Sequence, residues 1–452
     1  MQQLIFIFLT AVAGYFAFKQ YRRIYRNINL GTSASFNGNI GQRVWNTILI
    51  AFGQKKMFKN WIPALLHLFI YVAFLFTQVE LLEIIIDGIF GVHRFFAPVL
   101  GSLYTWIISS IEILSFLALI ATFVFLWRRN LLKVPRLVKS ELNGWPKLDA
   151  NLILIGELLL VTGILTMNGA DILLQGMDPQ HFPSTGNLAI SSIFGPIFFG
   201  SFEPESLLIL ERVGWWLHFS VVLGFIVYLP YSKHLHIFLA FPNVYFSDLS
   251  PRGKMENMPE IMHEVKSMLG IPSDMAESEN DEMPEFGAKD IFDLSWKNIL
   301  NAYTCTECGR CSAVCPANIT GKKLSPRKIM MDIRDRADEV GRNIASGKDS
   351  FFKEGNSTIN DKGINVKNYD DGKSLFDYIS REEIHACTTC NACVEACPVM
   401  INPLEPILKL RRYEILSESA GPAEWFPMFN AMENGGCVWQ IPEDRDKWRQ
   451  EA

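Results

Sequence analysis

Eight cysteines of this chain stand in two copies of one short pattern, C-x2-C-x2-C-x3-C-P. The first run contains Cys305, Cys308, Cys311 and Cys315. The second run contains Cys387, Cys390, Cys393 and Cys397. Thiolates at these intervals hold a pair of [4Fe-4S] clusters, and the fourth cysteine of each run ligates the other cluster. The spacing therefore predicts two clusters and a role in moving electrons, with Cys397 completing the first triplet and Cys315 the second.

Two other uses of paired cysteines fit the pattern less well. Zinc ribbons contain C-x2-C pairs, but they need neither a third cysteine after two further residues nor a closing Cys-Pro. Disulfides are rare in reducing compartments, where thiolates that bind iron persist, so we expect residues 300–400 to face the cytoplasm. Cys437 is left over, and we interpret it as a small, partly buried side chain rather than a redox group.

The first 240 residues hold most of the apolar side chains in a chain of 452 residues that is 49% hydrophobic. This length allows two or three domains, and the net charge of −5 gives no case for a nucleic-acid partner. A membrane-spanning helix needs about 20 apolar residues. The segments that qualify are Leu4–Phe18, Trp61–Ile86, Leu103–Trp127, Leu152–Leu174 and Leu207–Leu229.

The loops between these segments predict the orientation in a bacterial inner membrane. The loops Lys19–Lys59 and Arg128–Lys147 are rich in Lys and Arg, whereas Leu174–Leu207 contains neither. By the positive-inside rule the N-terminus lies outside and the cysteine runs lie in the cytoplasm. The first segment precedes its basic residues and shows no cleavage site, which favours a retained membrane anchor over a signal peptide.

We expect an all-α protein in three parts. Residues 1–240 form a transmembrane domain, 241–295 an interfacial segment with an acidic linker, and 296–452 a cytoplasmic domain. In the first two parts, Val44–Phe58 indicates an amphipathic helix on the membrane surface, and the apolar, aromatic segment His236–Phe246 is expected at the same interface. The segment Asp274–Asp293 is acidic, which is typical of a solvated tether.

The cytoplasmic domain is predicted to be an α-helical ferredoxin, because helices rather than alternating strands follow both cysteine runs. Ser325-Pro326 and Asn402-Pro403 are typical helix starts, with a capping side chain followed by proline at the first helical position. The structured part is expected to begin near Trp296. Residues 346–373, polar and rich in Gly, Asn, Asp and Lys, indicate a surface loop.

Histidines within or beside a membrane span are costly unless they bind something. His67 lies about two turns into the second span. His236 follows His218 by 18 residues, which is five turns of one helix, so these two share a face and His234 points nearly opposite to His218. His67 and His236 are thus expected at one depth, as in a bis-histidine haem b. The alternative is an interfacial anchor at His236 and a hydrogen-bonded polar residue at His67.

His218 keeps three interpretations: a ligand of a five-coordinate haem, a residue lining a quinone pocket, or a hydrogen-bonding side chain. A second bis-histidine haem would need a partner about ten residues beyond His67, where the chain has Thr77. Carboxylates also mark the spans, at Glu80, Glu83, Glu112 and Glu157. Buried carboxylates could serve the proton uptake of quinone reduction, or Glu80 and Glu83 could lie among lipid headgroups.

Several motifs carry a resemblance to known families. Trp-Ile-Pro-Ala-Leu-Leu-His67, Trp215-Trp216-Leu-His218 and Pro230-Tyr-Ser-Lys233-His-Leu-His236 resemble the cytochrome b subunits of respiratory nitrate reductase and membrane-bound heterodisulfide reductase. Cys-Thr-Glu-Cys-Gly-Arg-Cys, Leu-Ser-Pro-Arg-Lys-Ile-Met and Cys-Thr-Thr-Cys-Asn-Ala-Cys resemble the iron-sulfur part of heterodisulfide reductase. A similar fused layout is found in the membrane electron-transfer-flavoprotein:menaquinone oxidoreductases. The resemblance implies a five-helix haem b domain, a ferredoxin domain and exchange of electrons with menaquinone.

Two departures from these families shape the expectation. The nitrate reductase subunit has two histidines ten apart on its second span, but here Thr77 follows His67 at that interval, so one haem is expected and a second is possible. The fused relatives continue into domains with Cys-Cys pairs, which this chain lacks. The resemblance therefore implies a separate soluble partner, either a Cys-Cys-domain iron-sulfur protein or an electron-transfer flavoprotein, with its dock at Gly435–Trp448.

The sequence thus predicts a quinone-linked oxidoreductase subunit in the membrane lipid. It would pass electrons between a soluble cytoplasmic protein and menaquinone through two [4Fe-4S] clusters and haem b. The alternative is a membrane-anchored iron-sulfur sensor or scaffold without quinone turnover. The residues assign no catalytic side chain, and they leave open the direction of electron flow and the substrate beyond the partner.

Overall fold

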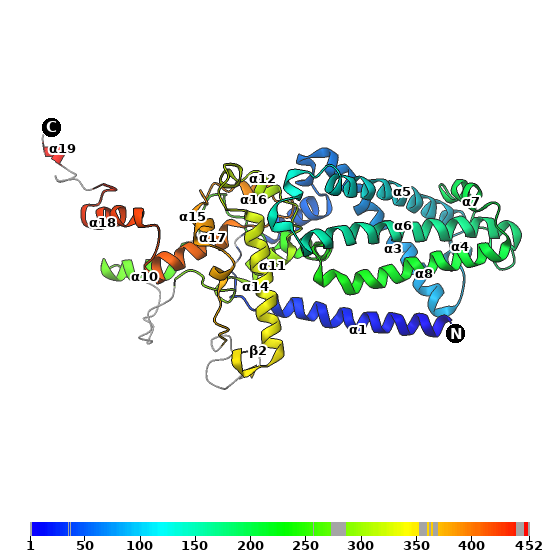
Figure 1. The fold of residues 1–452 in the computed structure, drawn as a ribbon, viewed down its shortest axis with the longest axis horizontal. Helices are drawn as coiled ribbons and strands as arrows, with labels where there is room; N and C mark the ends of the chain where they lie inside the picture. The colour runs from blue at the N-terminus through cyan, green and yellow to red at the C-terminus, as the bar shows by residue number, and fades with distance from the viewer. Residues whose placement is uncertain are drawn as a thin grey trace.

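The computed structural model consists of a bundle of long helices joined to a smaller helical domain (Figure 1). It describes residues 2–34, 36, 38–255, 257–272, 286–351, 359–360, 363–364, 369–439 and 447–450. Much of the expected acidic tether Asp274–Asp293 and part of the expected dock Gly435–Trp448 lie outside the described residues.

Five helices of the bundle are long and apolar enough to cross a membrane. They are α1 (Gln2–Ile28), α3 (Trp61–Phe90), α5 (Ser102–Asn130), α6 (Trp145–Met177) and α8 (Pro204–Tyr228). All the expected spans are therefore found as helices. The largest difference is in α1, which continues past Phe18 through its basic residues to Ile28 and enters the second domain.

Short elements connect these helices. They are α2 (Ile40–Asn46), the π-helical η1 (Thr47–Phe52), η2 (Met57–Lys59), α4 (Phe96–Leu100), η3 (Pro135–Leu137), η4 (Ser140–Leu142) and α7 (Ser191–Phe199). The expected surface helix Val44–Phe58 is only partly correct, because helical structure is interrupted after Phe52 and resumes only at Met57. Gln54 then adopts a left-handed conformation with φ of 50°, which turns the chain back toward the start of α3.

Helices α6 and α8 cross closely because each has a glycine at the contact. A Cβ atom on Gly214 would lie 2.6 Å from the backbone nitrogen of Met167, and one on Gly163 would lie 3.0 Å from that of His218. Small residues of this kind let helix backbones approach each other in membranes. The crossing therefore fixes His218 against α6.

The fifth span does not continue through the later histidines, which corrects the single-helix geometry expected above. Helix α8 ends at Tyr228, and Ser232 is extended with ψ of 149°. Three further elements follow, η5 (Leu229–Tyr231), η6 (Lys233–Leu235) and α9 (His236–Tyr245). The Ser232 hydroxyl caps η6 by accepting from the backbone N–H of His234 at 3.0 Å. The segment expected at the membrane interface, His236–Phe246, is largely helical as α9, and its position at the interface stays a prediction.

The second domain is built from helices and short turns. They are α10 (Pro259–Met268), α11 (Trp296–Thr304), α12 (Arg310–Ala313), α13 (Pro316–Ile319), α14 (Pro326–Ser346), η7 (Asp349–Phe351), η10 (Leu375–Asp377), α15 (Arg381–His385), α16 (Ala392–Ala396), α17 (Leu404–Arg412), η11 (Tyr413–Ser417), η12 (Ala423–Trp425), α18 (Phe426–Gly435) and α19 (Lys447–Gln450). The strands β1 (Ile359–Asn360) and β2 (Gly363–Ile364) form one antiparallel pair within the polar segment 346–373. Helical structure thus follows both cysteine runs, as expected.

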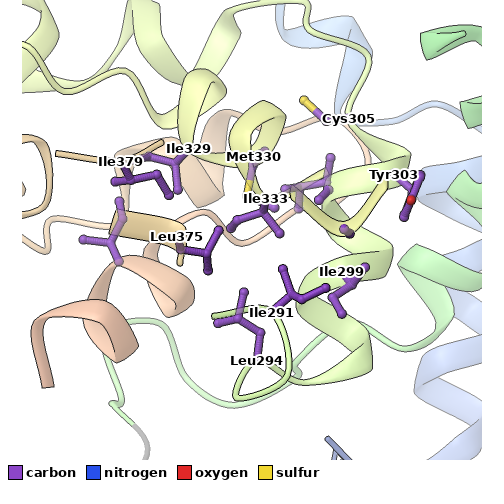
Figure 2. Close-up of a cluster of buried hydrophobic side chains, with 14 of the residues drawn as sticks. Ile291, Leu294, Ile299, Tyr303, Cys305, Ile329, Met330, Ile333, Leu375 and Ile379 are labelled. Atoms are coloured by element: carbon purple, nitrogen blue, oxygen red, sulfur yellow. The ribbon is translucent and has the colours of Figure 1, made fainter. Parts of the chain in front are cut away.

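One apolar core holds this domain together and ties it to the bundle. Ile291, Leu294, Ile299 and Ile333 are fully buried in it, and Cys305 lies at its edge (Figure 2). The core therefore starts before Trp296, the expected beginning of the domain. Ile24 and Ile28 of α1 belong to the same core, together with residues of α11 and α14. The first membrane helix is thus part of the second domain as well.

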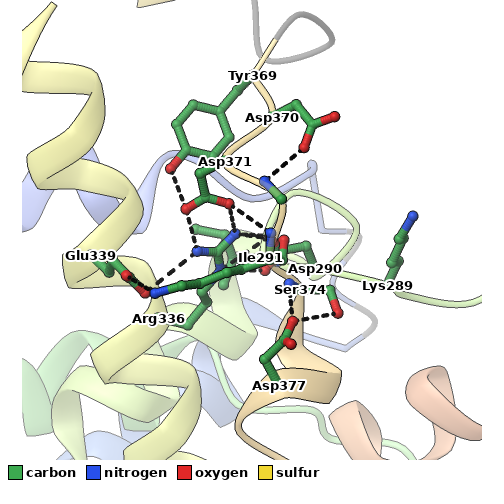
Figure 3. Close-up of polar contacts among 12 residues, drawn as sticks. Lys289, Asp290, Ile291, Arg336, Glu339, Tyr369, Asp370, Asp371, Ser374 and Asp377 are labelled. Carbon is green, nitrogen blue, oxygen red and sulfur yellow. Dashed lines mark hydrogen bonds and ion pairs between the residues drawn. The ribbon is translucent and has the colours of Figure 1, made fainter. Parts of the chain in front are cut away.

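A buried guanidinium anchors the end of the polar segment 346–373. Arg336 of α14 donates to the Asp371 carboxylate at 2.7 and 2.9 Å and to Asp290 at 3.0 Å, and solvent does not compete for it because it is fully buried (Figure 3). Tyr369 donates to the same Asp371 at 2.8 Å. The segment therefore returns to the domain surface at a fixed point, even though its polar composition indicates a loop.

Candidate metal centres

The two cysteine runs adopt the same backbone shape. In each, the second and fourth residues after the first cysteine have positive φ: Glu307 and Gly309 at 55° and 70°, Thr389 and Asn391 at 56° and 61°. These are left-handed conformations, which glycine and asparagine tolerate best. At Gly309 the close approach matters as well, because a Cβ atom would lie 2.5 Å from a guanidinium nitrogen of Arg327. The repeated turns bend each run into a loop that can present several thiols to one point.

The structure brings the first triplet together with the last cysteine of the second run. One pocket is lined by four cysteines and by apolar side chains that include Met330, Val399 and Ile401; the cysteines are Cys305, Cys308, Cys311 and Cys397. Burial raises the pKa of Cys305 to about 12 and that of Cys397 to about 11. Thiols in such surroundings ionise only when a cation compensates them, as a bound metal does.

The remaining four cysteines form a second group that is more exposed. The thiols that act electrostatically on Cys387 and Cys393 include those of Cys315 and Cys390. Cys390 is exposed, whereas Cys315 is buried. Backbone N–H groups point at sulfur atoms in both groups: Thr389 donates to Cys387 Sγ at 3.4 Å, and Ile401 to Cys397 Sγ at 3.3 Å. Such donors stabilise thiolates that ligate clusters.

The number of thiols around the first pocket fits a cluster, which takes four cysteines. Within the part of the chain that the structure describes, no three side chains of His, Cys, Asp or Glu come close enough to share one metal ion. A zinc site needs four ligands on one atom, whereas a cuboidal cluster takes each thiolate on a different iron. The residues present therefore fit the cluster.

Two histidines from separate elements face each other near the cysteine domain. The ring centroids of His67 in α3 and His236 at the start of α9 lie 6.4 Å apart, with 43° between the ring planes. Two imidazole nitrogens that each lie about 2 Å from one metal put the ring centroids roughly 6 Å apart. The pair thus has a separation at which two imidazoles could hold one metal.

Hydrogen bonds orient both rings for such a metal. Nδ1 of His67 lies 3.1 Å from Oε1 of Gln54, and Nδ1 of His236 lies 3.1 Å from the carbonyl oxygen of Lys233. Among the described residues, Nε2 of neither ring has a hydrogen-bond partner. A second partner on the far nitrogen is the usual way in which a protein fixes a ligating histidine. No pattern in the sequence indicated this role of Gln54.

The other membrane histidine expected as a site residue lies elsewhere. His218 is buried and places Nδ1 3.1 Å from the carbonyl oxygen of Leu160, so it makes the expected hydrogen bond, while its ligand and quinone interpretations stay predictions. His234 stacks edge-on against Phe225, and its Nε2 lies 3.7 Å from Glu157. His234 is therefore held toward Glu157, and its ring lies 5.7 Å from that of His236.

The remaining histidines have other partners. His385, which the sequence places beside Cys387, binds Glu414 at 2.7 Å and stacks on Trp425. His93 binds Asp171 at 2.8 Å. His181 pairs with Asp178 on the surface. None of these contacts involves a cysteine.

Sequence reasoning missed a buried ion pair that joins the two candidate centres. The amino group of Lys233 binds the carboxylate of Glu307, which lies between Cys305 and Cys308, and Arg334 binds the other carboxylate oxygen at 2.8 Å. Burial alone would raise the pKa of Glu307, but Arg334 and Lys233 hold it below its ordinary value. The only available signal was a charged residue inside each motif, and sequence alone does not reveal its partner.

Further contacts hold the first cysteine run against the loops of the bundle. Arg310 donates to the carbonyl oxygen of Met57 at 3.3 Å. Arg327 donates to the carbonyl oxygen of Arg136 at 2.6 Å and to Glu141 at 2.7 Å. The Cys305 group therefore lies on the side of its domain that faces the histidine pair.

Comparisons with known proteins agree with the cysteine chemistry. Residues 304–401 match the family of 4Fe-4S dicluster domains. A Bacillus subtilis protein named "Probable iron-sulfur-binding oxidoreductase FadF" is 28% identical over 99% of this chain and 61% of its own length. The "EtfAB:quinone oxidoreductase" of Syntrophomonas wolfei is 27% identical over 90% of this chain and 53% of its own length.

A shorter match and a missing one complete the comparison. The "Probable membrane-anchored ferredoxin" of Chromohalobacter salexigens is 34% identical over 30% of this chain and 20% of its own length. No solved structure matches the chain. The chain spans about three fifths or less of the length of these relatives, and the likeness of residues 1–240 to cytochrome b subunits stays a prediction. Over nearly its whole length, then, this chain is similar to iron-sulfur oxidoreductases, and it carries a 4Fe-4S dicluster domain.

Proposed function

We propose that this protein is a membrane electron-transfer subunit that connects a soluble cytoplasmic redox protein with the menaquinone pool. Cys305, Cys308, Cys311 and Cys397 would hold one [4Fe-4S] cluster. Cys387, Cys390, Cys393 and Cys315 would hold the other. His67 and His236 would hold haem b. When bound, these groups supply the one-electron carriers between a soluble protein and a quinone.

The observation that carries the proposal is the position of the histidine pair beside the buried cysteine group. His236 is three residues from Lys233, whose amino group binds Glu307 within the first cysteine run. The two candidate centres are thus joined by one short, buried connection. A sensor or scaffold would need no histidine pair poised next to its clusters, so the arrangement favours electron transfer.

The two cysteine groups differ in a way that suits opposite ends of a path. Cys390 of the second group is exposed, and it could approach a soluble partner. The first group lies against the loops of the bundle through Arg310 and Arg327. The protein side chains therefore position the exposed group for exchange with the partner and the buried group for exchange with the membrane domain.

The names of the relatives support the two ends of this path. One relative is named an EtfAB:quinone oxidoreductase, which agrees with an electron-transfer flavoprotein on the soluble side and a quinone in the membrane. A separate Cys-Cys-domain iron-sulfur protein is the other partner that the resemblance implies. Basic residues in the loops before α3 and before α6 support a cytoplasmic position for the cysteine domain.

Redox spectroscopy of the purified full-length protein tests the proposal. We expect the absorption bands of a low-spin b haem after reduction, and the electron paramagnetic resonance signals of two [4Fe-4S] clusters. In proteoliposomes, menaquinol should reduce the haem within the same preparation. Failure to find the haem bands or the cluster signals would refute the proposal.

A further inference from the structure

Helix α4 lies at the end of the bundle opposite the cysteine domain (Figure 1). A buried set of charged side chains contacts the start of this helix. We call it the Arg94 cluster, and its members are Glu80, Glu83, Asp87, Arg94, Glu112 and Asp171. Glu80 and Glu112 each stand ten residues inside the end of a long helix, a rise of about 15 Å. A hydrocarbon core about 30 Å thick therefore reaches their level.

The cluster contains more acidic groups than basic ones. The Arg94 guanidinium lies 3.8 Å from Glu80, 3.8 Å from Glu83 and 3.4 Å from Asp171. One cation thus faces three carboxyl groups, and Asp87 and Glu112 add two more. Uncompensated negative charge is very costly in so buried a place. At least one of these carboxyl groups must therefore carry a proton.

Four of the five carboxyl groups make hydrogen bonds that hold neighbouring segments in place. Glu83 and Asp87 accept from the backbone N–H groups of Phe96 and Phe95, at 2.9 and 3.1 Å. Glu112 accepts from the backbone N–H of Ile190 at 2.8 Å. These three thus hold the loops at this end of the bundle.

Asp171 is the fourth carboxyl group with hydrogen-bond partners. It contacts His93 at 2.8 Å and accepts from Gln175 at 2.9 Å.

Glu80 differs from the other four. It is 1% exposed, and neither of its carboxyl oxygens has a hydrogen-bond partner among the described residues. The polar groups that act on it come from every neighbouring element. They are Glu83 from α3, Arg94 from the following loop, Tyr104 and Glu112 from α5, and the amide of Asn168 from α6. A costly carboxyl group that fixes no loop is best explained by a function.

A connected series of contacts leads from Glu80 to the surface. Arg94 bridges Glu80 to Asp171, and Asp171 contacts His93. The His93 side chain is 19% exposed, and Arg212 lies 3.4 Å from its other nitrogen. The His93 ring therefore lies between the buried cluster and water.

We propose that the Arg94 cluster is a proton-exchange site for a quinone, with Glu80 as the group that loads and releases the proton. Reduction of the quinone consumes two electrons and two protons and gives the quinol, and oxidation releases both. The protons then cross at the end of the bundle opposite the cysteine domain. This inference rests on the proposed function for the quinone, while the proton on Glu80 can be tested separately.

The first experiment measures that proton. The infrared spectrum of the full-length protein at neutral pH should contain the C=O band of a protonated, buried carboxyl group, and Glu80→Gln should remove that band. The visible haem spectrum checks that the variant is assembled. Identical carboxyl bands in the two proteins would overturn the inference. If Glu80→Gln does not assemble, Glu80→Asp replaces it. Its shorter side chain moves the carboxyl group, so the band should shift, and an unshifted band would also overturn the inference.

The second experiment measures turnover in proteoliposomes. Glu80→Gln should slow menaquinol-driven haem reduction at least tenfold, with reduction by dithionite unchanged. The matched control is Asp178→Asn, an exposed carboxylate beyond the end of α6 that pairs with His181, and it should stay within twofold of the unchanged protein. Normal turnover by Glu80→Gln overturns the inference and leaves the proposed function standing. If the unchanged protein does not react with menaquinol, the proposed function fails, and the infrared result still decides whether Glu80 holds a proton.

Discussion

Lys233 and Glu307 form an ion pair in which both side chains are buried, and it connects the loop that carries His236 with the first cysteine run. The backbone carbonyl oxygen of Lys233 lies 3.1 Å from Nδ1 of His236. The amino group of Lys233 also donates to the carbonyl oxygen of Pro146 at 2.7 Å. One residue therefore contacts the surroundings of both candidate centres. Movement of the cysteine domain away from the bundle would have to break this pair.

Lys233→Ala should destabilise the junction and slow electron transfer across it. Removing one partner of a buried ion pair typically costs about 3–5 kcal/mol, since the other charge is left uncompensated. Arg334 would still neutralise part of Glu307, so we expect the lower end of that range. The readouts are the thermal loss of cluster absorbance and the rate at which the haem is reduced through the clusters.

The control for this change is Lys59→Ala. Lys59 is 54% exposed and pairs with Glu395 on the surface, and exposed pairs contribute about 1 kcal/mol or less. Equal effects of the two substitutions on stability and on haem reduction would show that Lys233 has no special role at the junction.

His67→Ala and His236→Ala should each abolish the low-spin haem spectrum and leave the cluster signals intact. The reason is that these two rings lie 6.4 Å apart with their Nδ1 atoms already engaged. His234→Ala should retain the haem, because that ring packs against Phe225 and lies toward Glu157. Visible and paramagnetic resonance spectra of the three variants decide the matter. Loss of the haem only in His234→Ala would show that His234, and not His67 or His236, is the ligand.

Arg336→Ala should be strongly destabilising. Arg336 is fully buried and binds Asp290 and Asp371 (Figure 3), so its removal leaves acidic groups without their cation and costs about 3–5 kcal/mol. The control is Lys373→Ala, which removes only an exposed partner of Glu339. Arg334→Ala is less suitable as a control, because Arg334 binds the buried Glu307. Melting of the cysteine domain should shift markedly for Arg336→Ala and little for Lys373→Ala.

The same network predicts a dependence on acid. Burial alone would raise the pKa of Asp371, but its bonds with Arg336 and Tyr369 lower it to about 2. An unfolded aspartate titrates near pH 3.9, so the carboxylate contributes fully above about pH 4 and loses its contribution as the pH falls toward 2. The stability difference between the unchanged protein and Asp371→Asn should therefore be constant from pH 8 to pH 5 and narrow below pH 4. A difference that grows on acidification would contradict this sign.

Local patterns in the sequence predict the elements well. Apolar runs locate all five long helices, because length and hydropathy alone decide which segments can cross a bilayer. Ser325 and Asn402 act as helix caps, with backbone N–H groups of the first turn bonded to their side chains. The meeting of His67 and His236 also follows from their depth, although the single helix assumed between His218 and His236 is wrong.

Contacts between distant segments are what the sequence could not provide. Ser232 breaks the chain after α8, and neither Pro230 nor Ser232 specifies how far the chain turns. Lys233 binds Glu307, which lies 74 residues further along the chain, and Arg94 binds Asn168 across the same separation. Burial of Glu80 and Glu83 likewise depends on how loops fold over the bundle. Their exposures of 1% and 2% show that protein groups surround both side chains.

The crossing of the two cysteine runs gives the last prediction. Cys397 lines the same pocket as Cys305, Cys308 and Cys311. The Cys315 thiol, in contrast, interacts electrostatically with the thiols of Cys387 and Cys393. Cys397→Ser should therefore disturb the same paramagnetic resonance signal as Cys305→Ser, and Cys315→Ser should disturb the signal affected by Cys387→Ser. Cys437→Ser is the control, and it should leave both signals unchanged because Cys437 lies in neither run. If Cys315→Ser and Cys305→Ser alter one signal together, each run holds its own cluster and the crossed assignment is wrong.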